Sequence, residues 1–147
     1  MEINTASATI SFAKKLEEDS AKFYEDLSQR YAKDADVLLS FAKENRKNIV
    51  QVERAYYGVI TDAIEGCFAF KVNPDEYTLE TELTEKTSYS DALEKAVDME
   101  EKIIKFYLDA AEQSKSLMAD VPRAFKMVAK KRDNRSSMLK SLPGKGA

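Results

Sequence analysis

The chain has 147 residues, of which 44% are hydrophobic and 33% charged, with no Trp, no His and a net charge of −3. This is the size of one domain, 1–147, and the composition favours a helical protein over a β-sandwich or a disordered chain. No apolar run reaches the ~18 residues of a membrane span, and the first residues lack the pattern of a signal peptide. The lone Cys67 cannot form an internal disulfide, so we expect a cytoplasmic protein.

The first half of the chain predicts a helical hairpin, because apolar residues recur there at helical spacing. The first helix begins at Thr5 or Ser7 and ends near Tyr31. The second begins near Asp36 and could continue to Gly66, a residue suited to ending a helix. The inward stripes of the two helices are Ile10, Ala13, Glu17, Ser20, Tyr24, Leu27 and Tyr31, and then Leu38, Phe41, Asn45, Asn48, Val52, Ala55 and Val59.

Residues 67–88 lose the helical period. Asn73-Pro74-Asp75 is a turn signal, and the residues after it have an extended or irregular pattern. A link of about 20 residues is uncommon inside a compact domain, but some four-helix bundles need one long crossover between their two halves. We therefore predict a crossover connection here.

The last part of the chain predicts a second hairpin. Ser88 can cap the third helix, with Asp91 three residues later as in a capping box. The fourth helix begins near Asp120-Val121-Pro122 and ends before Pro143, which leaves a tail at 143–147. The two inward stripes are Leu93, Ala96, Glu100, Ile103, Tyr107 and Ala110, and then Val121, Phe125, Val128, Arg132, Arg135 and Leu139. The predicted fold is all-α.

The two hairpins begin with the same phrase, a Glu followed after five residues by Phe-Tyr. It occurs at Glu17 with Phe23-Tyr24 and again at Glu100 with Phe106-Tyr107. A carboxylate on an inward stripe is costly unless it is paired or bound to a metal. The alternative is a small error in register that places both glutamates on the solvated face. The two tyrosines could donate to the glutamates or pack as plain core, and we favour plain core.

The repeated phrase, the long crossover and SYSDALEKAVDMEEK at the start of the second hairpin resemble the rubrerythrin-like branch of the ferritin-like superfamily. The resemblance spans nearly the whole chain and implies a ferritin-like four-helix bundle. It also implies a di-iron site, built from one Glu on each of two helices and a Glu-x-x-His on each of the others. In this chain the Glu-x-x-His positions hold Asn45 and Asn48 in FAKENRKN, and Arg132 and Arg135 in VAKKRDNR.

These substitutions remove the metal ligands. Arg has no acceptor for a cation, and Asn supplies one neutral oxygen that suits calcium better than iron. The charges of two Glu and two Arg cancel, and Arg matches the geometry of a carboxylate. We expect a network without metal or other cofactor, made by Glu17, Asn45, Asn48, Glu100, Arg132 and Arg135. The alternative for Arg132 and Arg135 is a position on the surface.

We expect a non-catalytic ferritin-like protein that has lost its di-iron site and serves as a binding or assembly module. It would form a homodimer and bind neither nucleic acid nor membrane. The alternative is a rubrerythrin-like iron-binding oxidoreductase or peroxidase, or an iron-handling protein, with a reduced or displaced site. Its ligands would be Glu17, Glu44, Glu53 and Glu100.

Charge is unevenly distributed along the chain. Residues 121–147 carry eight Lys or Arg against Asp133, whereas residues 75–101 carry ten Asp or Glu against Lys86 and Lys95. The basic segment is either a patch for an acidic partner or a helix beside acidic elements of the same bundle. We favour the second interpretation, because no aromatic residues interleave with the basic ones as they would in a nucleic-acid groove.

Overall fold

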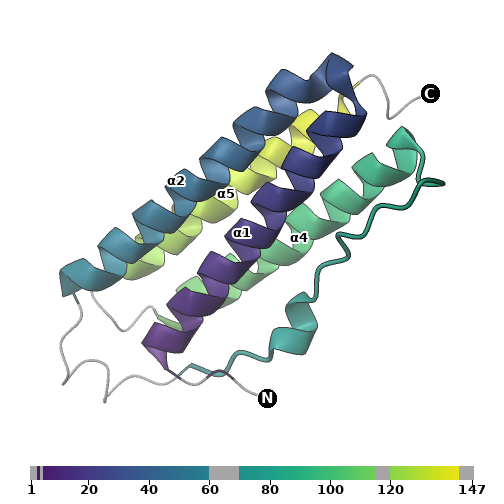
Figure 1. Ribbon diagram of the computed structural model, residues 1–147. Coiled ribbons are helices and arrows are strands. Elements are labelled where there is room, and N and C mark those ends of the chain that lie inside the picture. The colour runs from purple at the N-terminus through teal and green to yellow at the C-terminus, as the bar shows by residue number, and fades with distance from the viewer. Residues whose placement is uncertain (1–2, 4, 60–69, 115–119, 143–147) are drawn as a thin grey trace.

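The computed structural model describes residues 3, 5–59, 70–114 and 120–142, and its regular structure in these ranges is helical (Figure 1). The prediction of an all-α fold is confirmed. Within the described ranges no helix is long and apolar enough to cross a membrane. The predicted extension of the second helix to Gly66, the first residues of the crossover (67–69) and the tail at 143–147 lie outside the described residues. The elements in chain order are α1 (Ala6–Arg30), η1 (Ala32–Asp34), α2 (Ala35–Val59), η2 (Pro74–Tyr77), α4 (Tyr89–Gln113) and α5 (Asp120–Lys140).

The helices begin where side chains cap them. Thr5 Oγ1 accepts a hydrogen bond of 3.0 Å from the Ala8 amide at the start of α1. Ser88 Oγ accepts one of 3.0 Å from the Asp91 amide at the start of α4, as predicted. Such caps satisfy amides that have no partner inside the helix.

The helices form two hairpins that pack side by side. The most extensive contacts join α1 to α2 and α4 to α5, and smaller ones join α2 to α5 and α1 to α4. The helices therefore follow one another around the bundle in the order α1, α2, α5, α4. In this arrangement α2 and α4 lie at opposite corners, as Figure 1 shows.

The connection between α2 and α4 runs lengthwise along the bundle beside α4, where residues 70–88 are described (Figure 1). Its predicted turn is the short helix η2, and Asn73 Oδ1 accepts from the Asp75 amide there. The Arg30 guanidinium donates to the carbonyls of Leu83 and Thr84 at 3.0 and 2.7 Å. The crossover is thereby fastened to the end of α1.

The core contains apolar side chains and, at its centre, charged ones. The predicted stripes face inward wherever side-chain burial is described, which leaves out Val59, although Tyr31 and Ala55 are only partly buried. By residue volume, the two largest fully buried side chains are Arg132 and Arg135, which are 0% and 1% exposed. The alternative that placed these arginines on the surface is wrong. Charged groups in such a position need partners of opposite charge.

Candidate functional site

Glu17 on α1 and Glu100 on α4 are both 0% exposed, so the alternative that placed them on the solvated face is wrong. Each accepts a hydrogen bond from a tyrosine of the other helix. The Tyr24 hydroxyl donates to Glu100 Oε2 at 2.5 Å, and the Tyr107 hydroxyl donates to Glu17 Oε2 at 2.8 Å. The plain-core interpretation of these tyrosines is therefore wrong.

This exchange follows from the repeated phrase. In each helix the Tyr lies seven residues after the Glu, which is close to two helical turns and places both side chains on one face. Because α1 and α4 run in opposite directions (Figure 1), the Tyr of each helix comes beside the Glu of the other. The repeat thus encodes a symmetric pair of hydrogen bonds between the two hairpins.

Arg132 joins the two carboxylates from α5. Its Nε donates to Glu17 Oε2 at 3.0 Å, and its Nη2 lies 2.8 Å from Glu17 Oε1. Its Nη1 donates to Glu100 Oε1 at 2.6 Å. The remaining contacts are from Nη2 to Asn45 Oδ1 at 3.1 Å and from Nη1 to Ser20 Oγ at 3.5 Å. One guanidinium therefore connects all four helices.

Arg135 extends the cluster toward the surface. Its Nη1 donates to Asn45 Oδ1 at 2.6 Å, and its Nη2 donates to Glu44 Oε1 at 2.7 Å and to the Phe41 carbonyl at 3.2 Å. The guanidinium lies 4.8 Å from the centroid of the Phe41 ring and 5.4 Å from that of Tyr24. Such contacts between a cation and aromatic faces help to hold a buried charge. The Glu44 side chain is 39% exposed and marks the edge of the cluster.

The two asparagines complete the network from α2. Asn45 Oδ1 accepts from both arginines, and its Nδ2 donates to Ser20 Oγ at 3.0 Å. Asn48 Nδ2 donates to Glu17 Oε1 at 3.1 Å. Two buried atoms of the cluster, Asn48 Oδ1 and Arg135 Nε, have no hydrogen-bond partner among the described residues. Each such atom lowers the stability that the network can supply.

The charges of the buried groups balance, with Glu17 and Glu100 against Arg132 and Arg135. Burial acts to lower the pKa of Arg132, but Glu100 and Glu17 outweigh it and raise that pKa well above its usual value. The guanidinium therefore stays charged. The pKa values of Tyr24 and Tyr107 lie well above the usual value. The main cause is burial, and the second is the charge of the neighbouring carboxylate. Both phenols remain neutral donors.

The residues present do not fit a di-iron centre. The guanidinium of Arg132 bonds to both carboxylates and has no lone pair to offer a metal. Over the described ranges, no three His, Cys, Asp or Glu side chains gather in a group that could hold a metal ion. In the alternative ligand set, Glu44 is engaged by Arg135, and Glu53 is partly exposed and lines a small cavity together with Ile49 and Tyr107.

All six side chains that sequence reasoning grouped together lie in this one cluster. The predicted network did not contain Ser20, nor Glu44, which was considered only as an alternative metal ligand, nor Tyr24 and Tyr107, whose bonds to the glutamates were the option not favoured; the structure adds all four. Two features of the sequence could have indicated Ser20 and the tyrosines. Ser20 lies on the inward stripe three residues after Glu17, and both tyrosines recur at the same distance from a buried Glu.

We expect Tyr24 and Tyr107 to resist ionisation up to the pH at which the chain unfolds. Their raised pKa means that the folded chain keeps protons that the unfolded chain loses above about pH 10. Their contribution to stability is therefore complete below pH 10 and is lost as the pH rises beyond it. The measurement is denaturant unfolding at a series of alkaline pH values, with tyrosinate absorbance recorded in parallel. The Tyr24→Phe/Tyr107→Phe variant should lose less stability over this range, and equal losses in both proteins would contradict the prediction.

Comparison with known proteins found no matching family model, no matching curated protein and no matching solved structure.

Proposed function

We propose that this chain is a ferritin-like bundle of the rubrerythrin-like kind in which a network of Glu, Arg and Asn replaces the di-iron site. It would act without catalysis, as a binding or assembly module, in the simplest case as a homodimer. One observation carries the proposal, namely the Arg132 guanidinium bonded to both Glu17 and Glu100. On this proposal, a cation of the protein itself takes the place between the carboxylates that the resemblance assigns to a metal.

The positions of the substituted residues support the same proposal. Asn45 and Asn48 on α2, and Arg132 and Arg135 on α5, hold the Glu-x-x-His positions of the resemblance, and all four contact the same pair of glutamates directly or through one another. On this proposal, loss of the ligands would have been accompanied by a compensating charge at the same place.

The network is suited to fixing how the helices align, which is what a binding or assembly module without catalytic activity needs. Glu17, Asn45, Glu100 and Arg132 come from four different helices and meet in one set of short contacts. Ion pairs buried in this way can specify how helices align, even where they add little net stability. The outer faces of the bundle would then be presented in a constant arrangement to a partner.

The proposal is tested by measuring the metal content of tag-free protein produced in iron-supplemented medium. We expect far less than one equivalent of iron, manganese or zinc, colourless protein and no turnover of peroxide. A stoichiometric metal that is lost from the Glu17→Gln/Glu100→Gln variant would contradict the proposal. It would favour an iron-handling protein or oxidoreductase with an unfamiliar ligand set.

A further inference from the structure

A shallow groove of about 590 Å³ lies on the outward face of α2, and we call it the basic groove. Its described lining residues are Lys43, Arg46, Lys47, Val50, Gln51 and Arg54. Arg46 pairs with Glu25 at the rim, whereas Lys43, Lys47 and Arg54 make no ion pair with any described residue. The groove therefore carries positive charge that none of its described lining residues balances.

Exposed apolar side chains lie in a row on the same face of α2, and we call them the apolar row. Leu39, Val50 and Tyr57 are 46%, 45% and 66% exposed. Their separations of 11 and 7 residues are close to whole helical turns, so they share one face and extend over about 27 Å of the helix. Apolar side chains gathered among charged ones, unlike single scattered ones, indicate a surface that binds another protein.

Helix α5 adds to this surface beside the basic groove. Lys131 Nζ donates to Gln51 Oε1 at 3.0 Å, and Gln51 Nε2 donates to Met127 Sδ at 3.4 Å. Met138 follows Met127 by 11 residues and lies on the same face of α5, and the two are 49% and 46% exposed. The edge of the groove thus supplies a further cation and flexible apolar side chains, which adapt to the shape of a partner.

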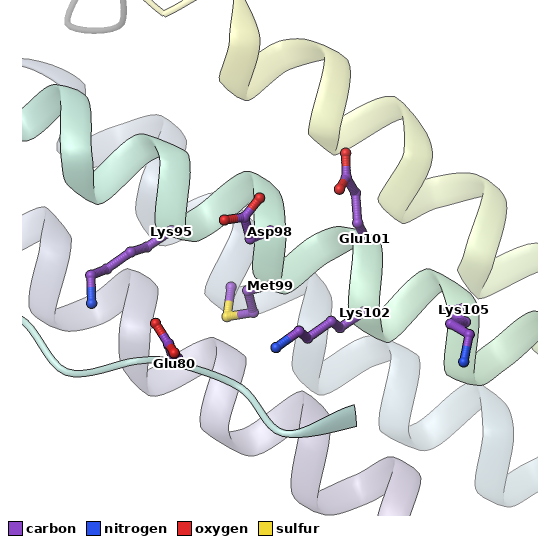
Figure 2. A pocket seen from close by; sticks show the side chains of 7 residues that line it. All are labelled: Glu80, Lys95, Asp98, Met99, Glu101, Lys102 and Lys105. Carbon is purple, nitrogen blue, oxygen red and sulfur yellow. The ribbon is translucent and has the colours of Figure 1, made fainter. Parts of the chain in front are cut away.

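The hollow between α4 and the crossover differs from the basic groove in its charges (Figure 2). It measures about 370 Å³, and carboxylates and ammonium groups line it in equal number, so the two signs offset each other there. Its charged residues are Glu80, Asp98, Glu101, Lys95, Lys102 and Lys105. The basic groove has cations alone among its charged lining residues, and its complement is an anionic partner.

We propose that the basic groove binds an acidic amphipathic helix of another protein. Carboxylates of that helix pair with the cations of the groove, and its apolar side chains, spaced at i, i+3, i+4 and i+7, cover the apolar row. The inference rests on the proposed role as a binding module and names the chemistry of the partner. Its test measures binding at the outer face, whereas metal content concerns the buried cluster, so either can fail without the other.

The shape and the apolar row favour a helix over other anionic partners. A hollow on a helix accepts the ridge of side chains that a second helix presents, whereas a flat lipid surface leaves the hollow unfilled. A nucleic-acid backbone presents phosphates but no apolar groups that could cover Leu39, Val50 and Tyr57. Because the apolar row follows the axis of α2, a partner helix that lies along α2 buries all three side chains.

Fluorescence anisotropy with a labelled synthetic peptide tests the proposal. The probe has about three repeats of Leu-Glu-Glu-Ala-Leu-Glu-Lys, whose leucines share one face of a helix. We expect the full chain to bind it with a Kd below about 0.1 mM in about 0.02 M NaCl, and about tenfold more weakly in about 0.3 M NaCl, where charges are screened. A peptide of the same composition with its leucines spread around the helix should also bind about tenfold more weakly.

Paired variants identify the surface that binds the peptide. Lys47→Glu/Arg54→Glu reverses two charges of the basic groove and should abolish binding. The matched control is Lys71→Glu/Lys86→Glu, which makes the same change in net charge at exposed positions on the connection beside α4, across the bundle from α2. It should bind the peptide like the parent.

A second pair of variants tests the apolar row. Val50→Ser removes an apolar side chain from the groove without changing its charge, and it should weaken binding about threefold. The control is Leu108→Ser on α4, where the side chain is 49% exposed, and it should leave binding unchanged. Circular dichroism checks that all four variants are folded.

Several results would overturn the proposal. These are no binding of the probe peptide in low salt, equal affinity for the rearranged peptide, and a loss of binding in Lys71→Glu/Lys86→Glu as complete as that in Lys47→Glu/Arg54→Glu. Sedimentation with vesicles of phosphatidylserine and phosphatidylcholine adds a further outcome. Binding to these vesicles through Lys47 and Arg54, without binding to the peptide, would assign the basic groove to a lipid surface instead.

Discussion

The Arg132→Leu variant should lose about 3–5 kcal/mol of unfolding free energy, because it leaves two buried carboxylates without their shared cation. Glu17 and Glu100 are both fully buried, and the contacts of Arg132 to their carboxylates measure 2.6 to 3.0 Å. The tyrosine hydroxyls that remain can donate to the carboxylates but cannot balance their charge, and the remaining cation, Arg135, lies 3.5 Å from Glu100 and pairs with that carboxylate only. Denaturant unfolding at neutral pH measures the loss.

The same substitution in a protein that lacks the two carboxylates distinguishes the loss of charge pairing from the loss of side-chain packing. In the Glu17→Gln/Glu100→Gln protein, the same Arg132→Leu change removes no ion pair and should cost much less, since it takes away a buried charge that lacks a partner. Lys130→Leu on the same helix is exposed and should change stability by less than about 0.5 kcal/mol. If Arg132→Leu behaves like Lys130→Leu, the buried network does not contribute as described.

Introducing the ligands that the resemblance implies should convert the network into a metal site. The variant carries Asn45→Glu, Asn48→His, Arg132→Glu and Arg135→His, which writes Glu-x-x-His on both α2 and α5. We expect it to bind about two iron ions per chain, together with Glu17 and Glu100, whereas the parent binds far less. Metal analysis and the absorption spectrum after anaerobic addition of ferrous iron measure the gain.

This variant carries a dense group of carboxylates, so metal should also determine its folding. Without iron the like charges repel, and iron should raise the midpoint of thermal unfolding. The control adds Glu17→Gln/Glu100→Gln to the four changes and should bind little iron. If the four-residue variant is folded and binds no iron, the two helices do not place their side chains as a ferritin-like bundle would. The proposed origin of the network would then be wrong.

Much of the fold could be predicted from local patterns. The caps at Thr5 and Ser88 and the start of α5 at Asp120 follow from residues that act within one helical turn. The crossover was predicted by the loss of helical period after the second helix. Burial of Glu17 and Glu100 followed from the spacing of the stripes, because one face of a helix can be read from the order of its residues.

The sequence predicts which residues form most of the candidate site, but not which hydrogen bonds they make with one another. Sequence spacing places Asn45, Arg132 and the glutamates on inward faces. It does not state which donor meets which acceptor. The crosswise bonds of Tyr24 and Tyr107 depend on α1 and α4 running in opposite directions, which is a property of the assembled bundle. The engagement of Glu44 by Arg135 depends on how far a long side chain reaches between helices.

By itself, then, the sequence determined the helices, their inward faces and the absence of His from the chain, because each of these depends on residue type and on spacing along one helix. Tertiary structure alone decided that one guanidinium would bond to both glutamates, and that the tyrosine of each of the helices α1 and α4 would bond to the glutamate of the other. These features join residues up to 115 positions apart in the chain. Their distances are set by the packing of helices against one another, which no local pattern records.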